Sequence, residues 1–518
     1  MKKSQSAPES DVPVTPPTSA QNERRRRFRR AVAGVCAVLL LAAGYGVYWW
    51  VETDIVSCTG AFGDEALKET GERDECVGVT DGEFVFAPEF AEASAKILAE
   101  NRRVEESGLS SVSIAYFIPM TLGEGDTQDH DAINDELRGA YLAQYNWNRE
   151  TGTDNPVEPQ LRLLLANPGA ETAEWRFVVD ELTRRAQGGD RLRAVVGFGP
   201  SFDGTFEAIG ALDAAGIPTV AAAMTADPAV DPDVGPLRYF ARVGPTNAQE
   251  VAALANVLGT GAKRPTMIVD VRAGDTYTET LAQEFIARFP DLAEMYEEYD
   301  SSLDGLLQTM DDIRNNICSR PPDVVLFAGR GRVGLSEFLT SLASRNAECR
   351  ANPIRVITGD DATETILTDS GHAALTNGNV TVEYTALAHP SQWNFAAGKD
   401  PSVQEFSRFL DSYGTHFAGG PDNDGHAMIG YDSARIAIIA VRLSGETAPS
   451  LEHVEQAWGR FGECTVVDGV TGTIALDKGG NPQRKYMPLV TLQPDGQSVF
   501  VKPTWPTEDG SRPRYCDR

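Results

Sequence analysis

The sequence is poor in basic residues and in histidine. Its 518 residues include 46 Lys and Arg against 75 Asp and Glu, a formal net charge of -29 at pH 7, and only 6 His. Proteins that bind nucleic acids need lysines and arginines to neutralise phosphates, so this balance argues against a nucleic-acid partner. No Cys-x-x-Cys spacing occurs and the histidines are scattered, so the sequence predicts no metal centre.

Catalytic and phosphate-binding motifs are also absent. The chain has no GxSxG, HExxH, SxxK or GxxxxGKS/T segment, and its carboxylates are spread widely. The segment Gly329–Gly334 matches GxGxxG, but no acid ends a following strand about 20 residues later, as a dinucleotide site requires. Asp422–Gly425 begins like a calcium loop, yet Ser433 stands where a bidentate glutamate is needed, so we interpret it as a turn. We expect a binding protein with no cofactor and no catalytic residues.

The basic residues that do occur gather at the start of the chain, before a long uncharged run. Residues 1–30 carry eight Lys or Arg against three acids, and the 21 residues 31–51 carry no charge. Such a run can cross ~30 Å of hydrocarbon, with the basic side in the cytoplasm and Tyr48, Trp49 and Trp50 at the far interface. We predict a disordered cytoplasmic tail (1–30), a single-pass transmembrane signal anchor (31–51) in the cell membrane, and an extracytoplasmic remainder. The alternative is a cleaved signal peptide, although no small-x-small cleavage site follows closely.

Cysteine usage fits an oxidising compartment. Cys36 lies in the apolar run, which leaves six cysteines outside it. An even number there favours three disulfides, for which fifteen pairings are possible. The simplest set joins neighbours along the chain: Cys58–Cys76, Cys318–Cys349 and Cys464–Cys516.

From Ser110 onward, strand-like runs such as Val112–Phe117 alternate with helical segments of roughly 10–15 residues. This alternation predicts an α/β fold built on parallel sheets. About a dozen strands are too many for one open sheet, so we expect two lobes. Residues 52–108 precede this pattern and are too short for much of a core of their own, so we expect this small extracytoplasmic region to pack on the main domain or to act as a stalk.

The stretch Val195–Thr225, VVGFGPSFDGTFEAIGALDAAGIPTVAAAMT, is the clearest β-α-β unit. Two apolar strands flank one amphipathic helix, and small hydrogen-bonding residues follow each strand. In an open α/β sheet, ligands bind outside the carboxyl ends of the strands. The unit therefore predicts a binding site at those strand ends.

Several ordered segments carry a resemblance to a known family: LRGAYLAQYNWNRE, LRLLLANPG, AVVGFGPSFDG, GIPTVAAAMTAD, YFARVGPTNAQEVAALA and, most specifically, DGVTGTIALDKGGNPQRKY. From Val112 to about Val501 the chain resembles the type I periplasmic binding proteins, specifically the branched-chain amino acid and amide binding proteins of ABC importers. The resemblance implies two doubly wound parallel-sheet lobes joined by three crossovers. It assigns 109–245 and 388–463 to lobe 1, and 246–387 and 464–518 to lobe 2.

The resemblance also implies ligand contacts in the first lobe. There the family holds a ligand carboxylate with hydroxyl and main-chain groups, and these positions fall on Ser201, Ala223 and Thr225. Hydroxyls and strand-end N–H groups make a reasonable uncharged cradle for an anion. The structural alternatives are a helix N-cap for Ser201 and a plain strand end for Thr225.

In the second lobe, the resemblance implies an aromatic cap at Tyr277 and an acid for the ligand ammonium at Asp361, with Asp360 as the alternative one residue away. A surface tyrosine and a helix N-cap at Asp361 are the corresponding structural explanations. Where the family often has a second aromatic residue, this chain has Arg330 within Gly-Arg-Gly-Arg. A guanidinium there would favour a ligand with an additional acidic or polar group, or would simply fill the cleft.

These inferences predict an extracytoplasmic solute-binding protein. It would capture a small polar, amino-acid-like ligand by closure of its lobes and present the closed form to the permease of an ABC-type importer. The alternative is a membrane-anchored sensor that reports its ligand to a partner membrane protein.

Overall fold

The computed structural model describes residues 58, 66–70, 74–123, 126–150, 157–227, 237–259, 264–289, 296–395, 401–461, 466–483, 485–508 and 510. The predicted tail and signal anchor, and the predicted pair Cys464–Cys516, lie outside these residues. Within them, no helix combines the length and the apolar character needed to cross a membrane. Both lobes described below belong to one compact unit, Glu65–Arg518.

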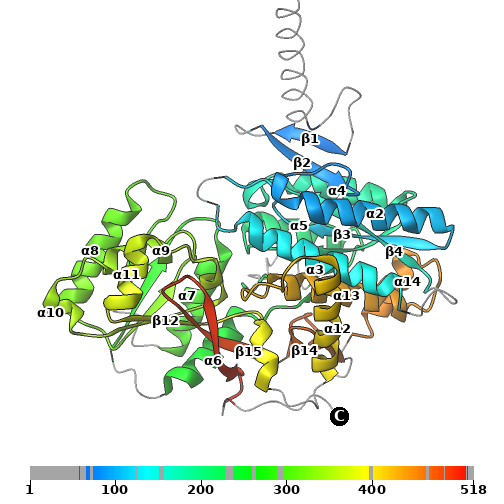
Figure 1. Cartoon of the computed structure of the whole chain (residues 1–518). Helices are drawn as coiled ribbons and strands as arrows, with labels where there is room; N and C mark the ends of the chain where they lie inside the picture. Colours follow the sequence, from blue (N-terminus) through cyan, green and yellow to red (C-terminus); the bar gives the residue numbers. More distant parts are fainter. Residues whose placement is uncertain are drawn as a thin grey trace, which may run out of the picture. The chain divides into compact units, whose positions relative to one another are not determined.

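The first lobe is built on a seven-stranded sheet in the order β1-β2-β4-β3-β5-β6-β7 (Figure 1). The five strands from β4 to β7 in this order pair in parallel, whereas β1 and β2 are antiparallel additions at the edge. The strands span Leu67–Thr70 (β1), Glu75–Thr80 (β2), Ser111–Phe117 (β3), Gln160–Asn167 (β4), Leu192–Gly197 (β5), Thr219–Ala221 (β6) and Phe240–Arg242 (β7).

Helices cover both faces of this sheet. The side chains of β3 show why: Val112, Ile114 and Tyr116 belong to one buried cluster, and Ala115 and Phe117 to another. Successive residues of a strand point to opposite faces, so a strand with apolar residues on both faces needs packing on both. One cluster contains α3 (His130–Asn148) and α13 (His426–Leu443), and the other contains α4 (Trp175–Gln187) and α5 (Asp203–Ala214).

Part of the region 52–108 also packs on the first lobe. Strand β2 pairs with β4, and α2 (Ala91–Ser107) places Ala93, Ile97 and Val104 in buried positions. Asn101 of α2 ties the helix to β4, because its amide donates to the Leu163 carbonyl at 2.7 Å and its oxygen accepts from the Leu163 N–H at 2.9 Å. These residues therefore extend the first-lobe sheet and its helical layer.

The second lobe repeats the layered arrangement on the sheet β16-β15-β12-β11-β10-β8-β9. Strands β8 to β12 pair in parallel, and β15 and β16 add two antiparallel strands at one edge. The strands span Pro265–Asp270 (β8), Tyr296–Tyr299 (β9), Val324–Ala328 (β10), Ile354–Thr358 (β11), Val380–Thr385 (β12), Met487–Leu492 (β15) and Ser498–Thr504 (β16). Its helices are α6 (Asn247–Leu258), α7 (Thr276–Arg288), α8 (Leu306–Ser319), α9 (Leu335–Leu342), α10 (Ala347–Arg350) and α11 (Asp369–Asn377).

The chain passes between the two sheets after β7, after β12 and after the β13–β14 hairpin (Val466–Gly469 and Gly472–Ala475). After β12, α12 (Pro401–His416), α13 and α14 (Leu451–Trp458) return to the first lobe. The hairpin also packs there, since Val467 and Ile474 belong to the first-lobe core, whereas the strands that follow join the second lobe. The expected α/β fold with two parallel-sheet lobes is confirmed.

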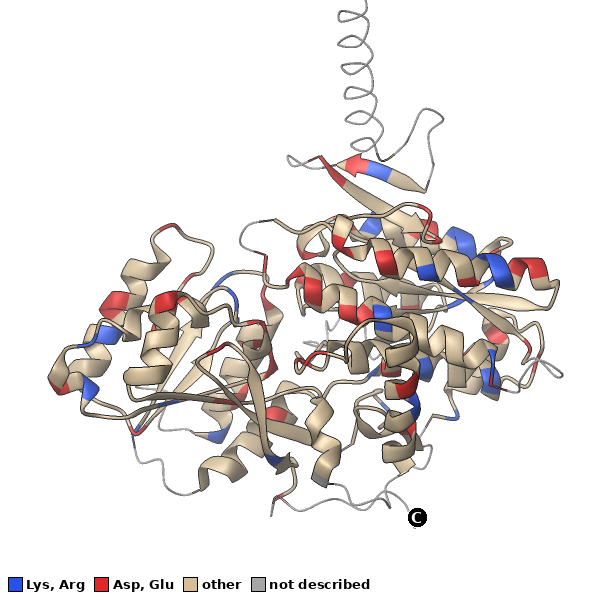
Figure 2. Cartoon of the chain, viewed as in Figure 1, with Lys and Arg blue, Asp and Glu red and all other residues tan. Residues whose placement is uncertain are grey.

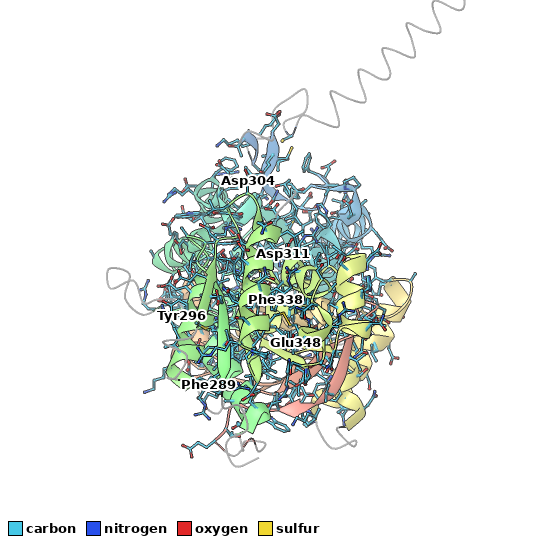
Figure 3. The ribbon with its side chains drawn as sticks, turned by 90° about the vertical axis from the view of Figure 1, so that its left-hand side faces the viewer. Phe289, Tyr296, Asp304, Asp311, Phe338 and Glu348 are labelled. Atoms are coloured by element: carbon cyan, nitrogen blue, oxygen red, sulfur yellow. A yellow bond between two sulfur atoms is a disulfide. The ribbon has the colours of Figure 1, made fainter. Side chains whose placement is uncertain are left out.

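One predicted disulfide, Cys318–Cys349, is confirmed and joins α8 to α10 of the second lobe. Cys58 and Cys76 are both disulfide-bonded as well. Figure 3 faces the second lobe, with Asp311 on α8 and Glu348 on α10. Acidic residues are distributed over the helices of both lobes (Figure 2), in keeping with the net negative charge of the chain.

Candidate ligand-binding site

The residues expected to contact a ligand gather around one cavity between the lobes. Lobe 1 and lobe 2 each contribute three of them: Ser201, Ala223, Thr225, and Tyr277, Arg330, Asp361. The cavity has a volume of about 30 Å³, which is room for about two water molecules. An amino acid is larger than this, so the lobes must separate to admit one. The role of each residue in ligand contact stays a prediction.

The first-lobe residues lie in the loops after β5 and β6, as expected of strand ends in an α/β sheet. Ser201 does not cap the following helix, because α5 begins after Phe202 without a side-chain cap. Its hydroxyl instead accepts a hydrogen bond from the Ala226 N–H at 3.4 Å. Thr225 reaches across to the second lobe, where its hydroxyl donates to Oδ1 of Asp360 at 3.1 Å. Both hydroxyls are buried and lie at the cavity rather than in solvent.

Arg330 dominates the second-lobe side of the cavity. Its Nε and Nη2 donate to the two oxygens of Asp275 at 2.8 and 2.7 Å, and its Nη1 donates to Oδ2 of Asp361 at 2.6 Å. The guanidinium also lies 4.5 Å from the ring centre of Tyr277 and 5.2 Å from that of Phe202. Only 3% of Arg330 is exposed. The guanidinium therefore occupies the cleft and is held by two carboxylates of its own lobe.

This arrangement changes what Asp361 offers to a ligand. Its Oδ2 is bound to Arg330, and its Oδ1 accepts from the Gly331 N–H at 2.8 Å. Asp361 does not cap a helix, because the short helical turn η5 (Asp360–Glu364) has Gly359 at its N-cap. An ammonium group bound here would share Asp361 with the guanidinium. Asp275, the N-cap residue of α7, also binds Arg330, and it was not identified from the sequence. Its side chain accepts from the Thr278 N–H. An aspartate just before a helix is a recognisable capping signal in a sequence, but it does not reveal the contact with Arg330.

A pair of buried carboxyl groups lies beside the cavity. The Asp360 N–H donates to Oε2 of Glu250 at 3.2 Å, and the Thr385 hydroxyl donates to the same oxygen at 3.2 Å. Burial, and next the charge of Asp361, raises the pKa of Asp360 to about 7. Burial, and next the charge of Asp360, raises the pKa of Glu250 well above its usual value. The two groups therefore retain a proton between them at neutral pH.

A second group of charges surrounds His426 at the start of α13. Its Nε2 lies 2.7 Å from Oε1 of Glu364 in the second lobe, and its Nδ1 lies 3.1 Å from Oε1 of Glu136 in the first. Burial alone would lower the pKa of His426, but the charge of Asp424 and the bonds to the two glutamates raise it well above 6.5. The imidazole is therefore a cation that links the lobes. The sequence contains no pattern that marks these residues as a site.

Acidic residues near this group could be considered as metal ligands. Oxygens of Asp135, Asp422 and Asp424 lie within 4.8 Å of one another. Asp135 already pairs with Arg138 at 2.8 Å, and Asp422 is exposed. Asp135 is the buried member of the three, and its carboxylate is already neutralised by Arg138. We therefore do not interpret these three aspartates as a metal site.

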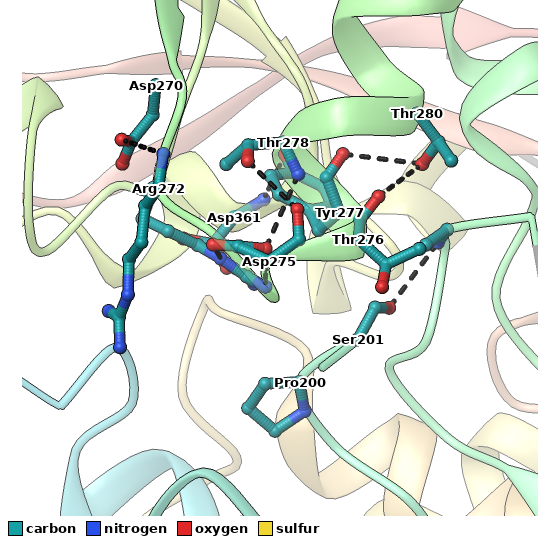
Figure 4. A network of polar contacts seen from close by, with 12 residues as sticks. Pro200, Ser201, Asp270, Arg272, Asp275, Thr276, Tyr277, Thr278, Thr280 and Asp361 are labelled. Atoms are coloured by element: carbon teal, nitrogen blue, oxygen red, sulfur yellow. Dashed lines mark hydrogen bonds and ion pairs between the residues drawn. The ribbon is translucent and has the colours of Figure 1, made fainter. Parts of the chain in front are cut away.

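The lobes contact each other directly around the cavity, where Ser201 of the first lobe lies beside the start of α7 in the second (Figure 4). The Tyr277 N–H donates to the Ser201 carbonyl at 3.3 Å, and the Thr276 hydroxyl donates to Asp203 at 3.0 Å. Two further ion pairs bridge the lobes: Arg272–Glu171, and Arg332–Asp129 at 3.6 Å. This set of contacts describes a closed arrangement of the two lobes.

Comparison of the sequence with protein-family models gives no match, and comparison with curated proteins gives none either. Solved structures do match. A leucine-binding protein from Thermotoga maritima aligns with a TM-score of 0.54 at 19% identity, over 76% of this chain and 98% of its own. A branched-chain amino acid transporter substrate-binding protein from Streptococcus pneumoniae, in complex with isoleucine, aligns with a TM-score of 0.52 at 16% identity, over 76% and 100%.

Similarity extends to a protein with another type of ligand. A solute-binding protein of an ABC transporter from R. palustris, in complex with 4-hydroxybenzoate, aligns with a TM-score of 0.55 at 13% identity, over 78% of this chain and 98% of its own. At these identities the matches establish the fold and leave the ligand open. The chain has the type I periplasmic binding fold, the fold of the substrate-binding proteins of branched-chain amino acid ABC transporters.

Proposed function

We propose that this chain is an extracytoplasmic solute-binding protein that captures a small polar, amino-acid-like ligand between its lobes and delivers it to an ABC-type importer. The observation that carries the proposal is the convergence of residues from both lobes on one cavity at the inter-lobe contact. A ligand held there touches both lobes at once. Its differential affinity for the closed form then shifts the equilibrium between open and closed arrangements.

The polar lining supports a binding role. The described lining includes hydroxyls, carboxyl groups, one guanidinium, one imidazole and the amide of Gln128, together with a few apolar side chains. Such a mixture orients a small molecule through hydrogen bonds and excludes water around it. The solved structures that share this fold are named as substrate-binding or solute-binding proteins.

A thermal-shift screen of the full-length chain against amino acids, amides and small acids tests the proposal. A ligand present at 100 times its Kd stabilises the folded state by about 2.7 kcal/mol. Ser201→Ala should reduce the shift produced by any hit, because it removes a hydroxyl at the cavity. Ser407→Ala is the matched control, since Ser407 is exposed on α12. If no compound raises the Tm, or if both variants respond like the unmodified chain, the proposed site is wrong.

A membrane-anchored sensor is the second candidate, favoured by the uncharged run at residues 31–51. It would capture its ligand in the same cleft and differ only in the protein that receives the closed form. Co-purification from native membranes separates the two. An ABC permease in the complex supports import, whereas a different membrane protein, with no permease, supports sensing.

A further inference from the structure

Carboxyl groups outnumber cations at the inter-lobe cavity. Four acidic residues line it, and among the described lining residues Arg330 and His426 are the two cationic ones. The four acids are Asp360, Asp361, Glu364 and Asp424. Further acids lie directly behind: Asp275 binds Arg330, Glu136 lies at hydrogen-bond distance from His426, and Glu250 accepts from the Asp360 N–H. The electrostatic character of the site is therefore acidic.

Both cations at the cavity already have acidic partners. Arg330 makes three hydrogen bonds to the carboxylates of Asp275 and Asp361, at 2.6 to 2.8 Å. His426 lies between two glutamates that come from different lobes. A ligand anion would have to displace these carboxylates or approach them closely. Neither cation is therefore available as an anion-binding group, contrary to what Arg330 alone suggests in the sequence.

The first-lobe groups do not offset this surplus. Ser201 and Thr225 contribute neutral hydroxyls, and the Thr225 hydroxyl already donates to Asp360. A ligand carboxylate seated at Thr225 would therefore lie next to a carboxyl group. Oε1 of Gln128, which also lines the cavity, is buried and has no hydrogen-bond partner within the part of the chain that the structure describes. Such an acceptor calls for a donor on the ligand, and an ammonium group has three.

We propose that the ligand is a small organic cation whose net positive charge is carried by ammonium groups, as in a diamine or a basic amino acid. This inference rests on the proposed solute-binding function and names the class of ligand for the same cleft. An ammonium group would lie among several carboxylates and complete their hydrogen bonding. Charge complementarity of this kind gives specificity, because a ligand that places a like charge beside these carboxylates is disfavoured.

The titration behaviour of the cavity agrees with a missing positive charge. Burial, with the charge of neighbouring carboxylates, raises the pKa of Asp360 to about 7, and it raises that of Asp424 to about 7 against the opposing effect of His426. A bound cation would favour the ionised forms of these groups. Binding should therefore release protons to the buffer.

Isothermal titration calorimetry on the full-length chain at pH 7 tests the ligand class with four probes: 1,4-diaminobutane, lysine, leucine and benzoate. At least one of the two cations should bind ~10-fold or more tightly than leucine, and benzoate should be the weakest. Repeating the cation titration in phosphate and in Tris should give different heats, because proton release is reported by the buffer. Comparing diaminobutane with lysine shows whether the ligand carries a carboxylate.

Three variants change the charge in known directions. Glu364→Gln removes one negative charge and should weaken cation binding by ~10-fold, whereas Arg330→Gln removes a positive charge and should strengthen it. Asp411→Asn on the exposed face of α12 is the control and should leave binding unchanged. A misfolded variant cannot bind more tightly, so the Arg330→Gln result guards against loss of structure.

The possible outcomes separate the two proposals. Leucine or benzoate binding more tightly than both cations, with the effect of Ser201→Ala intact, overturns the cationic ligand and leaves the solute-binding function standing. Weaker cation binding by Arg330→Gln, measured well below the Tm of that variant so that the protein is folded, overturns the charge argument in the same way. Failure of all four probes and of the wider screen overturns the solute-binding function and the ligand class with it.

Discussion

Removal of the Arg330 guanidinium has an effect on the free energy of unfolding that can be estimated directly from the structure. It is buried and makes three hydrogen bonds to two carboxylates, which are themselves buried or nearly so. Arg330→Met keeps most of the aliphatic volume and leaves Asp275 and Asp361 without their cation. Removing one partner of a buried ion pair costs about 3–5 kcal/mol. For a lobe of this size, that loss lowers the Tm by roughly 10 °C.

Differential scanning fluorimetry on the full-length chain measures this loss. Arg176→Met is the matched control, because Arg176 pairs with Glu207 at 3.2 Å while its side chain is 72% exposed; such surface pairs contribute about 0–1 kcal/mol. Adding Asp275→Asn to Arg330→Met should recover part of the Tm, since it removes one of the stranded charges and keeps a residue that can cap α7. A Tm for Arg330→Met no lower than that of the control would refute the reasoning.

Three further predictions concern other parts of the molecule. Because the pKa of Asp360 is raised to about 7, its contribution to stability is present at low pH and is lost as pH rises toward 7; Asp360→Asn should therefore flatten the Tm between about pH 4 and 8, and an unchanged slope would contradict this assignment. Cys318→Ser with Cys349→Ser opens a loop of 31 residues and should lower the free energy of unfolding by about 2–4 kcal/mol in denaturant titrations, without changing ligand affinity. His426→Gln removes the cation that links the lobes at Glu364, so small-angle scattering should show a larger radius of gyration; an unchanged radius would show that this contact does not hold the lobes closed.

The α/β architecture is predictable from the sequence because parallel strands buried on both faces must be continuously apolar. Strand β10, Val324–Ala328, is apolar and buried at every position and shows this pattern. For more polar segments, the sequence does not show which strand they pair with or which lobe they pack on. Strand β2 pairs with β4, which lies some 80 residues further along the chain, and the β13–β14 hairpin packs on the first lobe. Those positions depend on edge pairing and side-chain packing, which local periodicity does not encode.

The residues of the candidate site also fall into two groups, those that the sequence predicts and those that it does not. Ser201, Thr225 and Tyr277 follow strands or begin helices at one edge of each sheet, so strand-end reasoning and family resemblance both place them at the cleft. Glu250 and His426 could not be anticipated, because each lies within a helix and is buried only through its tertiary partners. A buried charge has no periodic signature; its burial depends on an opposite charge or a shared proton supplied from elsewhere in the fold.

The distribution of these charges gives the closing motion a physical basis. Glu136 and Asp424 belong to the first lobe and Glu364 to the second, so closure brings carboxylates together that water separates in an open form. His426 offsets this repulsion on one side of the contact, and the proton shared by Asp360 and Glu250 offsets it on the other. Such internal neutralisation allows the lobes to meet while it leaves a surplus of acid in the cleft. A cationic ligand would remove that remaining repulsion only in the closed form, which is the differential affinity that a ligand-driven closure requires.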